Sequence, residues 1–190
     1  AAARQEAQLL LELTQQLGNS LHLDETLSVL AEGLKKMLAF DSITIYVVRD
    51  EVLSPRYASG DCASILLARE IPVGDGLVGW VARQRTPVVN GNPCIELGAA
   101  DGVRAGQLES ALALPLMGVQ ETAGVLMLSR RNAHVFNEDH LRILLSIGSK
   151  LGIVVESPTS EANMKAIFKD LDGVLTRFPE VGDYNQKIAV

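Results

Sequence analysis

The stretch Glu70–Pro93 decides how the rest of the chain is interpreted, and it reads EIPVGDGLVGWVARQRTPVVNGNP. A short apolar run containing Pro72 leads into a glycine-rich turn, and the turn opens a segment that carries Trp80, the only tryptophan. Proline cannot donate a hydrogen bond to a neighbouring strand, so the apolar run is expected at a sheet edge. The stretch therefore predicts an edge strand, a tight turn, a short helix and a second short strand at Pro87–Val89.

The glycines of this turn follow the spacing Gly74-x-Gly76-x-x-Gly79, which is also the spacing of a dinucleotide-binding loop. Such a loop follows a central parallel strand, and an acidic residue for the ribose lies on the next strand. Here Pro72 marks an edge strand, and no acidic residue stands at the required place. The glycines therefore predict a tight turn and the close packing of a helix, rather than a phosphate loop.

Working outward, alternation of apolar and polar residues predicts an antiparallel sheet. In the first strand Ile43 and Ile45 point to one side, and Thr44 and Tyr46 to the other. The predicted strands are residues 42–49, 52–59, 71–73, 87–89, 110–117 and 121–129. Residues 60–69 are expected to form a loop or a short helix, and the glycine-rich residues 90–107 a long loop.

Helical spacing of leucines predicts a helix over residues 2–17 and a second one that begins near Asp24. A long helix is expected after Asn137, a suitable N-cap residue, and its first turn carries Glu138 and Asp139. A further amphipathic segment covers residues 162–177.

The long helix is apolar on more than one side. One face carries Leu141, Leu144, Leu145, Gly148, Leu151 and Val155, whereas Ile143, Ile147 and Val154 lie off it. One side is expected on the sheet, and the other against a second helix, for example from another copy of the chain. Gly148 and Gly152 would allow close approach of that helix or, equally, let the long helix lie flat on the sheet.

Composition narrows the function classes. The chain has 190 residues, 47% of them hydrophobic, and a formal net charge of -6 without a densely basic stretch. Nucleic acid and anionic membrane surfaces are therefore not expected partners. No run of about 18 apolar residues occurs, so no membrane-spanning helix is predicted.

Candidate catalytic and metal-ligating residues are few. Cys62 and Cys94 are too few for a disulfide framework and lack the spacing of a zinc site, which favours free thiols in a reducing cytoplasm. His134 and His140 are six positions apart and would not share one helix face, so no metal site is predicted. No serine or cysteine stands in a recognisable nucleophile motif.

Several short patterns, in this order, resemble those of a GAF domain over roughly Leu9 to Glu156. They are Phe40-Asp41, the Ile71–Ala82 stretch, Ser110-Ala-Leu-Ala-Leu-Pro-Leu116, Gly124-Val-Leu126 and Phe136-Asn-Glu-Asp139. The resemblance implies an α+β fold with a central antiparallel sheet. The terminal helices would cover one face, and short helices and loops would roof a small-molecule pocket on the other.

The implied function is that of a sensory or regulatory domain that is not an enzyme. Its expected partners are a small molecule of unknown identity and a second copy of the chain, which would pair through the terminal helices. The candidate ligand-binding residues are Tyr46, Tyr57, Trp80, Arg83, Cys94, Arg104 and Ser110. The arginines suit an anionic metabolite, whereas Trp80 could instead pack in the core. A pocket filled by the protein itself is a further reading.

The expected division of the chain is an N-terminal helix at residues 1–20, a GAF-like domain at 21–156 and a helix or linker at 157–190. The last segment would lead to an attached effector. Leu175-Thr-Arg-Phe-Pro-Glu180 weakly resembles the start of a diguanylate cyclase domain, although Arg177 and Glu180 depart from that pattern.

An enzymatic alternative stays open. Some GAF-like proteins reduce free methionine sulfoxide with pocket cysteines, and Cys62 and Cys94 both fall in segments expected to form the roof. The chain lacks the Cys-His pair typical of bilin-binding members, because alanine follows Cys62 and isoleucine follows Cys94.

Overall fold

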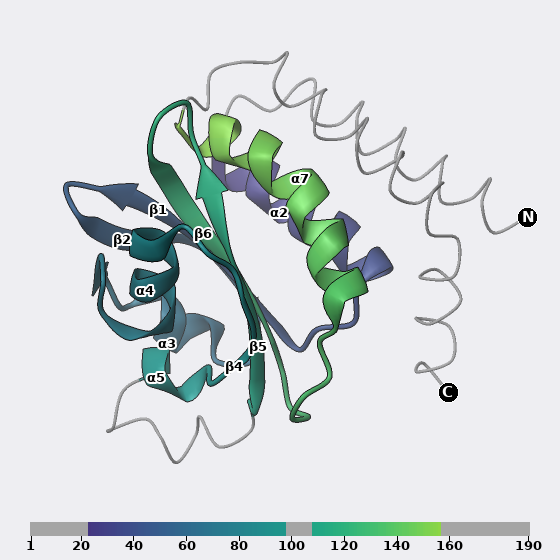
Figure 1. Cartoon of the computed structure of the whole chain (residues 1–190). Coiled ribbons are helices and arrows are strands. Elements are labelled where there is room, and N and C mark those ends of the chain that lie inside the picture. The colour runs from purple at the N-terminus through teal and green to yellow at the C-terminus, as the bar shows by residue number, and fades with distance from the viewer. Residues whose placement is uncertain (1–22, 98–107, 157–190) are drawn as a thin grey trace, which may run out of the picture.

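The computed structural model describes residues 23–97 and 108–156, which form a six-stranded antiparallel sheet between two layers of helices (Figure 1). The strand order is β3-β2-β1-β6-β5-β4. The strands are β1 Ser42–Arg49, β2 Val52–Gly60, β3 Ile71–Pro72, β4 Val88–Gly91, β5 Ser110–Met117 and β6 Thr122–Arg130. The α+β class and the antiparallel sheet expected from the sequence are confirmed.

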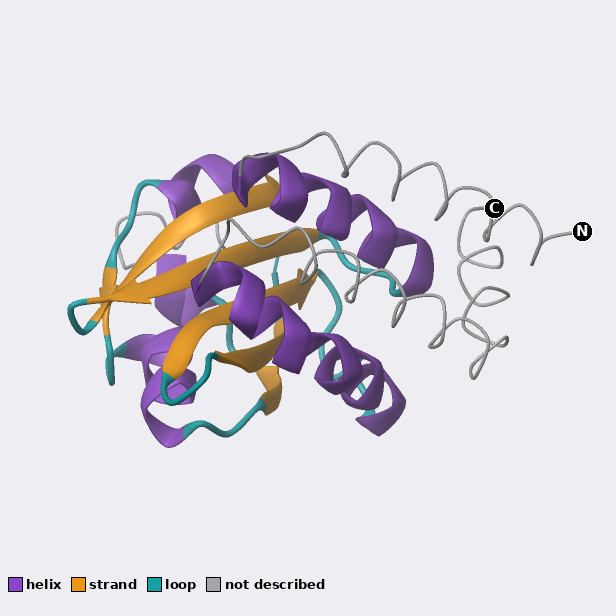
Figure 2. Ribbon diagram, turned by 90° about the horizontal axis from the view of Figure 1, so that it is seen from above, coloured by secondary structure: helices purple, strands orange, loops and turns teal. Residues whose placement is uncertain are grey.

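Helices cover both faces of this sheet (Figures 1 and 2). The long helices α2 (Leu23–Met37) and α7 (Glu138–Glu156) both pack on one face. The short helices α3 (Ala63–Leu67), α4 (Gly76–Gln84) and α5 (Cys94–Leu97) cover the other. We call these three short helices the roof.

The alternation of the central strands divides the interior into two cores. Ile43 and Ile45 of β1 join Leu112 of β5 in the core beneath α2 and α7. Tyr46 of β1 and Ala113 of β5 point the other way, into a second core beneath the roof. Each strand residue thus serves one layer, as period-two side-chain orientation requires.

Strand β2 changes phase along its length. A register shift lies between the Ile45–Tyr57 and Tyr46–Pro55 pairs of β1 and β2. Leu53 belongs to the roof core, whereas Tyr57 packs against the core beneath α2 and α7. Without the shift these two residues would share a face, because they are four positions apart on one strand.

The glycine-rich turn has the predicted structure. Gly74 and Gly76 have positive φ angles of 101° and 61°, which glycine adopts without strain. A Cβ atom at Gly79 would lie 2.5 Å from the carbonyl oxygen of Pro72, so glycine lets α4 pack directly on the edge strand. The sequence interpretation as a tight turn and closely packed helix is therefore confirmed.

The two-sided character expected for α7 is wrong in its details. Ile143, Ile147 and Val154, placed off the main face, are buried in the same core as Leu144 and Leu151. Leu145, assigned to the main face, is 48% exposed. The helix has one wide buried stripe on β5 and β6 of the sheet, and that stripe spans more than a single row of positions.

The paired glycines of α7 face the sheet. A Cβ atom at Gly148 would lie 2.6 Å from Cδ2 of Leu114, and one at Gly152 would collide with the backbone of Met117. Of the two alternatives, the structure shows the glycines letting α7 lie flat on β5.

Hydrogen bonds fix the start of α7. Asn137 Oδ1 accepts the backbone N–H of His140 at 3.0 Å, and His140 Nδ1 accepts that of Asn137 at 3.2 Å. Asn90 in β4 bonds Phe136 in both directions, with its Oδ1 accepting the Phe136 N–H at 3.0 Å and its Nδ2 donating to the Phe136 carbonyl at 2.8 Å. The expected cap at Asn137 is confirmed, and β4 is tied to the segment that precedes the helix.

One predicted loop contains a helix, and three predicted segments cannot be compared with the structure. The interval 90–107, expected to be a loop, contains α5 within its first half. The helix expected at residues 2–17, the remainder of that loop at 98–107 and the segment 157–190 lie outside the described residues.

Replacing Gly152 by Ala should lower the free energy of unfolding by about 2 kcal/mol, because the added methyl group collides with the β5 backbone and overpacks the interface. At an exposed glycine in a helix, the same change to alanine would instead raise the free energy of unfolding. Urea unfolding followed by circular dichroism measures the difference. Ser149→Ala, on the exposed side of α7, is the matched control and should change stability by less than about 0.5 kcal/mol. A Gly152→Ala variant at least as stable as the wild type would contradict the described packing.

Candidate functional site

The roof core encloses polar groups among apolar side chains. Its buried residues come from the sheet and from all three roof helices. They are Tyr46, Leu53, Leu66, Ile71, Leu77, Val78, Val81, Ala82, Leu97, Leu108, Ala111, Ala113, Val125 and Met127. Cys62 and Cys94 are half-buried against the same core.

Glu96 brings a carboxyl group into this region. The residue is only 2% exposed, although it lies on the four-residue helix α5. Its Oε1 atom accepts the backbone N–H groups of Leu77 and of Val78, the latter at 3.0 Å. These donors belong to the first turn of α4, where a helix has N–H groups without partners inside the helix.

The capping of α4 is therefore supplied from another element. Asp75 occupies the N-cap position, but its side chain makes no capping hydrogen bond. Glu96 takes that role from 18 and 19 positions further along the chain. The interaction joins α5 to α4 and closes the roof over the sheet, and the helix dipole favours a negative charge at this end.

Opposing effects act on the Glu96 carboxyl group. Burial raises its pKa above the ordinary value of 4.5, while the N–H groups of Val78 and Leu77 and the guanidinium of Arg69 lower it. Burial is the largest of these effects, so the net direction is upward. The site thus holds an acid whose proton is retained to higher pH than in an unfolded chain.

Tyr46 is the second polar group beneath the roof. Its side chain is fully buried, and its hydroxyl group has no hydrogen-bond partner among the described residues. Burial, and then the nearby charge of Glu96, raise the pKa of this phenol. A buried hydroxyl without a partner is costly, which makes Tyr46 a candidate to contact a bound molecule.

The candidate residues named from the sequence do not all come together. Tyr46 and Cys94 lie on the roof side. Ser110 has the strand phase of Leu112, so it points to the other face of the sheet, where it donates its hydroxyl hydrogen to the carbonyl of Asn132 at 2.7 Å. Cys94 Sγ lies 3.5 Å from the carbonyl oxygen of Leu108.

The other candidates point elsewhere. Tyr57 lies on the opposite face of the sheet, because the register shift in β2 reverses its direction. Trp80 is 43% exposed on the outer side of α4, so it neither packs in the core nor faces the sheet. Arg83 donates a hydrogen bond to the Val73 carbonyl at 3.0 Å and so braces the glycine turn. Arg104 lies outside the described residues.

Sequence reasoning missed Glu96. It stands in a glycine-rich segment with no helical or strand periodicity to show that it would be buried. The one usable signal is Asn92-Pro93 directly before α5, because these residues favour a turn that starts a short helix. The Asn92 side chain does accept the backbone N–H of Cys94, at 2.9 Å.

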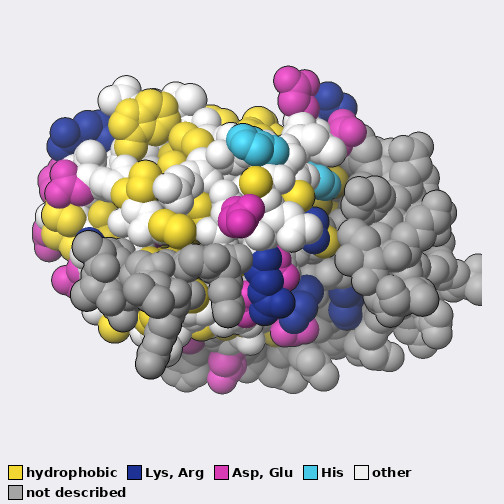
Figure 3. Space-filling model, turned by 90° about the horizontal axis from the view of Figure 1, so that it is seen from below, with side chains coloured by type: hydrophobic (Ala, Val, Ile, Leu, Met, Phe, Trp, Pro, Cys, Tyr) yellow, Lys and Arg dark blue, Asp and Glu magenta, His cyan; other side chains and the backbone are white. Residues whose placement is uncertain are grey.

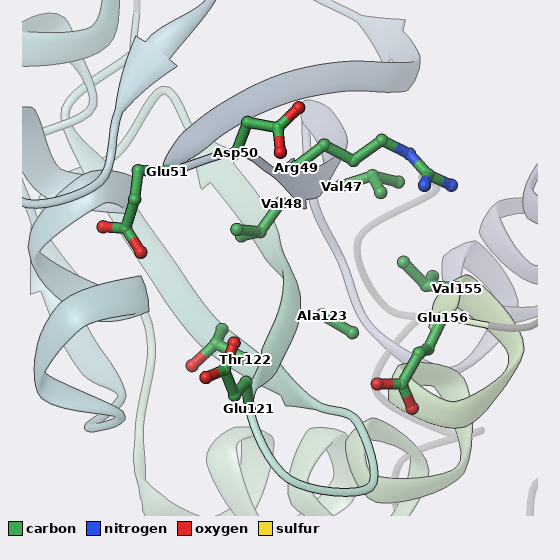
Figure 4. A pocket seen from close by; sticks show the side chains of 10 residues that line it. All are labelled: Val47, Val48, Arg49, Asp50, Glu51, Glu121, Thr122, Ala123, Val155 and Glu156. Carbon is green, nitrogen blue, oxygen red and sulfur yellow. The ribbon is translucent and has the colours of Figure 1, made fainter.

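Two adjoining cavities lie at one end of the sheet, and the smaller one borders the roof core at Val48, Val73 and Ala82. The larger, of about 360 Å³, is lined by the β1–β2 turn, the start of β6 and the end of α7. Figure 4 shows the side chains of Glu51, Glu121 and Glu156 around it. The smaller, of about 180 Å³, shares Glu51, Glu121 and Thr122 and reaches Arg83 and Arg85 on α4.

Charges of both signs are mixed on the described surface in Figure 3, where basic side chains lie beside acidic ones. Arg131 also donates two hydrogen bonds to the Asp61 carboxylate, at 2.6 and 2.8 Å. Among residues 23–97 and 108–156, no helix combines the length and apolar character needed to cross a membrane.

The raised pKa of Glu96 predicts a pH dependence. The folded protein keeps this proton at pH values where the unfolded chain has lost it, so the associated stability is complete below about pH 4.5 and declines as the pH rises through the raised pKa. Relative to Glu96→Gln, the wild type should lose up to about 1.4 kcal/mol per pH unit in that range. Urea unfolding between about pH 4.5 and 7.5 measures this difference.

The exposed Glu109 provides the control. Glu109→Gln should follow the wild-type pH profile. If Glu96→Gln also ran parallel to the wild type throughout, burial would not govern the titration of Glu96.

Known proteins share this architecture. A family model for the GAF domain matches residues 20–156. No curated protein sequence matches the chain significantly. Similar solved structures include the GAF domain of a two-component sensor histidine kinase from Bacillus halodurans, with 19% identity, a TM-score of 0.58, and coverage of 73% of this chain and 97% of that one.

Two further structures have the same fold. The GAF domain of a phosphoenolpyruvate-protein phosphotransferase from Coxiella burnetii has 16% identity and a TM-score of 0.58. The match covers 96% of this chain and 99% of that one. A type II free methionine-R-sulfoxide reductase from Thermoplasma acidophilum has 18% identity and a TM-score of 0.53. The match covers 80% of this chain and 96% of that one. The fold is thus shared by sensor domains and by enzymes. The match of the family model over residues 20–156, together with the sheet and its two helical layers, shows that the chain belongs to the GAF domain family.

Proposed function

We propose that this GAF domain is a non-enzymatic sensory domain that binds a small molecule beneath its roof. The observation that carries the proposal is the buried pair of polar side chains, Tyr46 and Glu96, among the mainly apolar side chains of the roof core. Ligand sites commonly combine apolar walls with a few convergent polar groups. Tyr46 has a hydroxyl group free to bond a ligand, and Glu96 links the ligand region to two roof helices.

A ligand beneath the roof could influence α7 through hydrogen bonds on the described residues. Thr122 at the start of β6 donates its hydroxyl hydrogen to the Ala82 carbonyl of α4, at 2.9 Å. At the tip of the same β5–β6 hairpin, the Val119 N–H donates to Glu156 at the end of α7, also at 2.9 Å. A displacement of α4 would therefore reach the end of the domain through one hairpin. A switch also requires that the ligand bind two states with different affinity.

We further propose that α7 contributes to a homodimer and passes the signal to an attached effector, which could be a diguanylate cyclase. Leu145, Ser149 and Ile153 recur at every fourth position on α7, and the two apolar members are 48% and 38% exposed. This stripe suits a helix from a second copy. A cytoplasmic location fits the two cysteines, which are not joined by a disulfide.

The second candidate function is reduction of a free sulfoxide by the two cysteines. The observation in its favour is that Cys62 and Cys94 both pack against the roof core, on the segments that begin α3 and α5. The solved structures that resemble this domain also include free methionine-R-sulfoxide reductases.

Native mass spectrometry of the freshly purified chain, combined with a methionine sulfoxide reduction assay, separates the two functions. The sensory function predicts a retained small molecule, or a ligand that raises the melting temperature, with no turnover. The enzymatic function predicts turnover that is lost in Cys94→Ser. Cys62→Ser is the matched variant, and a sulfoxide reductase activity dependent on either thiol would overturn the proposal.

The proposed dimer is tested by light scattering. Replacing both Leu145 and Ile153 with Glu should convert a dimer into a monomer, because charge would be buried at the interface. Leu67→Glu is the control, since Leu67 is 43% exposed on α3, in the roof on the other face of the sheet. A wild-type chain that stays monomeric at high concentration would contradict the dimer.

A further inference from the structure

Glu96 is surrounded by groups that can donate hydrogen bonds. Its carboxyl group receives the N–H groups of Leu77 and Val78, and the unpartnered hydroxyl of Tyr46 and the guanidinium of Arg69 lie within electrostatic reach. Among the described residues, two peptide donors thus bond this carboxyl group directly, while the buried hydroxyl of Tyr46 and the exposed cation of Arg69 interact with it electrostatically. Without Glu96, the same place would be an electropositive site lined by donors.

The glycine turn makes room for an anionic group at this place. A Cβ atom at Gly76 would lie 2.7 Å from Oε1 of Glu96, so any larger residue would enter the space that the carboxyl group occupies. The nine-residue helix α4 starts here and directs its first N–H groups at that space. Helix N-termini with accessible N–H groups are established binding sites for carboxylates and phosphates.

Tyr46 provides an observation independent of the helix. It projects from the central strand β1, is fully buried, and makes no hydrogen bond among the described residues. The Glu96 carboxyl group satisfies the helix donors but leaves this hydroxyl without a partner. A ligand that reached both the helix N-terminus and Tyr46 would satisfy every one of these donors.

We infer that Glu96 is an internal occupant of an anion-binding site, and that the small molecule sensed by this domain carries a carboxylate or phosphate group that takes its place. The inference rests on the proposed ligand-binding function and names the chemistry of its ligand. Displacement of Glu96 would release α5 from α4, since the two hydrogen bonds to Leu77 and Val78 join these helices. Ligand binding would thereby change the roof itself.

The test removes the Glu96 carboxyl group by mutation and then adds simple anions that could take its place. The 190-residue chain with Glu96→Ala is titrated with sodium acetate and with sodium phosphate, against sodium chloride at equal ionic strength. Saturable shifts of the Leu77 and Val78 amide resonances are expected, with a rise in melting temperature. Affinity should be at least about tenfold higher than in the wild type, where Glu96 competes. Acetate and phosphate are separate arms, and the anion that binds more tightly identifies the preferred group.

Two further variants keep the test decisive. Glu96→Gln preserves the size of the side chain and, if the Ala variant does not fold, should still bind acetate more tightly than the wild type because its occupant is neutral. Adding Tyr46→Phe to the vacated variant should weaken anion binding several-fold, an effect that a purely structural role for Tyr46 would not produce. Glu109→Ala, at an exposed position, should bind as the wild type does.

The inference is overturned if neither anion shifts the Leu77 and Val78 amides in a folded Glu96 variant, or if the wild type binds equally well. If the anion-site inference fails in this way but native mass spectrometry finds a ligand retained by the wild type, the proposed sensory function is still supported. Anion binding by the variant, without any ligand for the wild type, would instead support the site and count against the sensory function.

Discussion

The hydrogen bonds from the first turn of α4 to the Glu96 carboxyl group hold the roof together. They join two short helices that could not be stable alone, since isolated helices of this length are marginal in water. They also place the only buried carboxyl group of the described residues beneath that roof. Everything proposed about ligand binding depends on this one contact, because it decides whether the start of α4 is closed or available.

The other side of the sheet is built differently. There α2 and α7 bury leucine, isoleucine and valine side chains against the inner rows of β1, β5 and β6, and Gly148 and Gly152 bring α7 directly onto β5. Interiors packed at this density transmit displacement instead of absorbing it. A rigid helical layer and a roof held by few hydrogen bonds therefore suit a domain that receives a signal on one face and passes it on from the other.

The sheet could be predicted because alternation and turn residues are local signals. Val119 and its neighbours mark the β5–β6 hairpin, and the phase of Ile45 and Tyr46 correctly separated the two faces of β1. Tyr57 was named as a candidate because strand phase alone does not tell which face of the sheet holds the ligand, and the register shift beside Pro55 turns it away from the roof. Helical periodicity likewise placed Leu145 on the buried face of α7, although it is exposed. Periodicity shows which positions are apolar, but it does not show which of them other elements cover.

The site was harder to predict than the fold. Tyr46 was found because it lies on a strand with clear alternation, whereas Glu96 acquires its role only through contacts with residues 18 and 19 positions away. Arginines near the turn suggested an anionic ligand, yet Arg83 braces the turn itself. The stretch Glu70–Pro93 was read correctly as backbone geometry, and its chemistry depends on a residue just beyond it.

Amide hydrogen exchange at Leu77 and Val78 tests the central contact most directly. Both amides should be protected in the wild type and should exchange at least about tenfold faster in Glu96→Ala, while Asp75→Ala leaves them unchanged. Faster exchange in Asp75→Ala, with unchanged protection in Glu96→Ala, would contradict the role of Glu96 as the cap of α4.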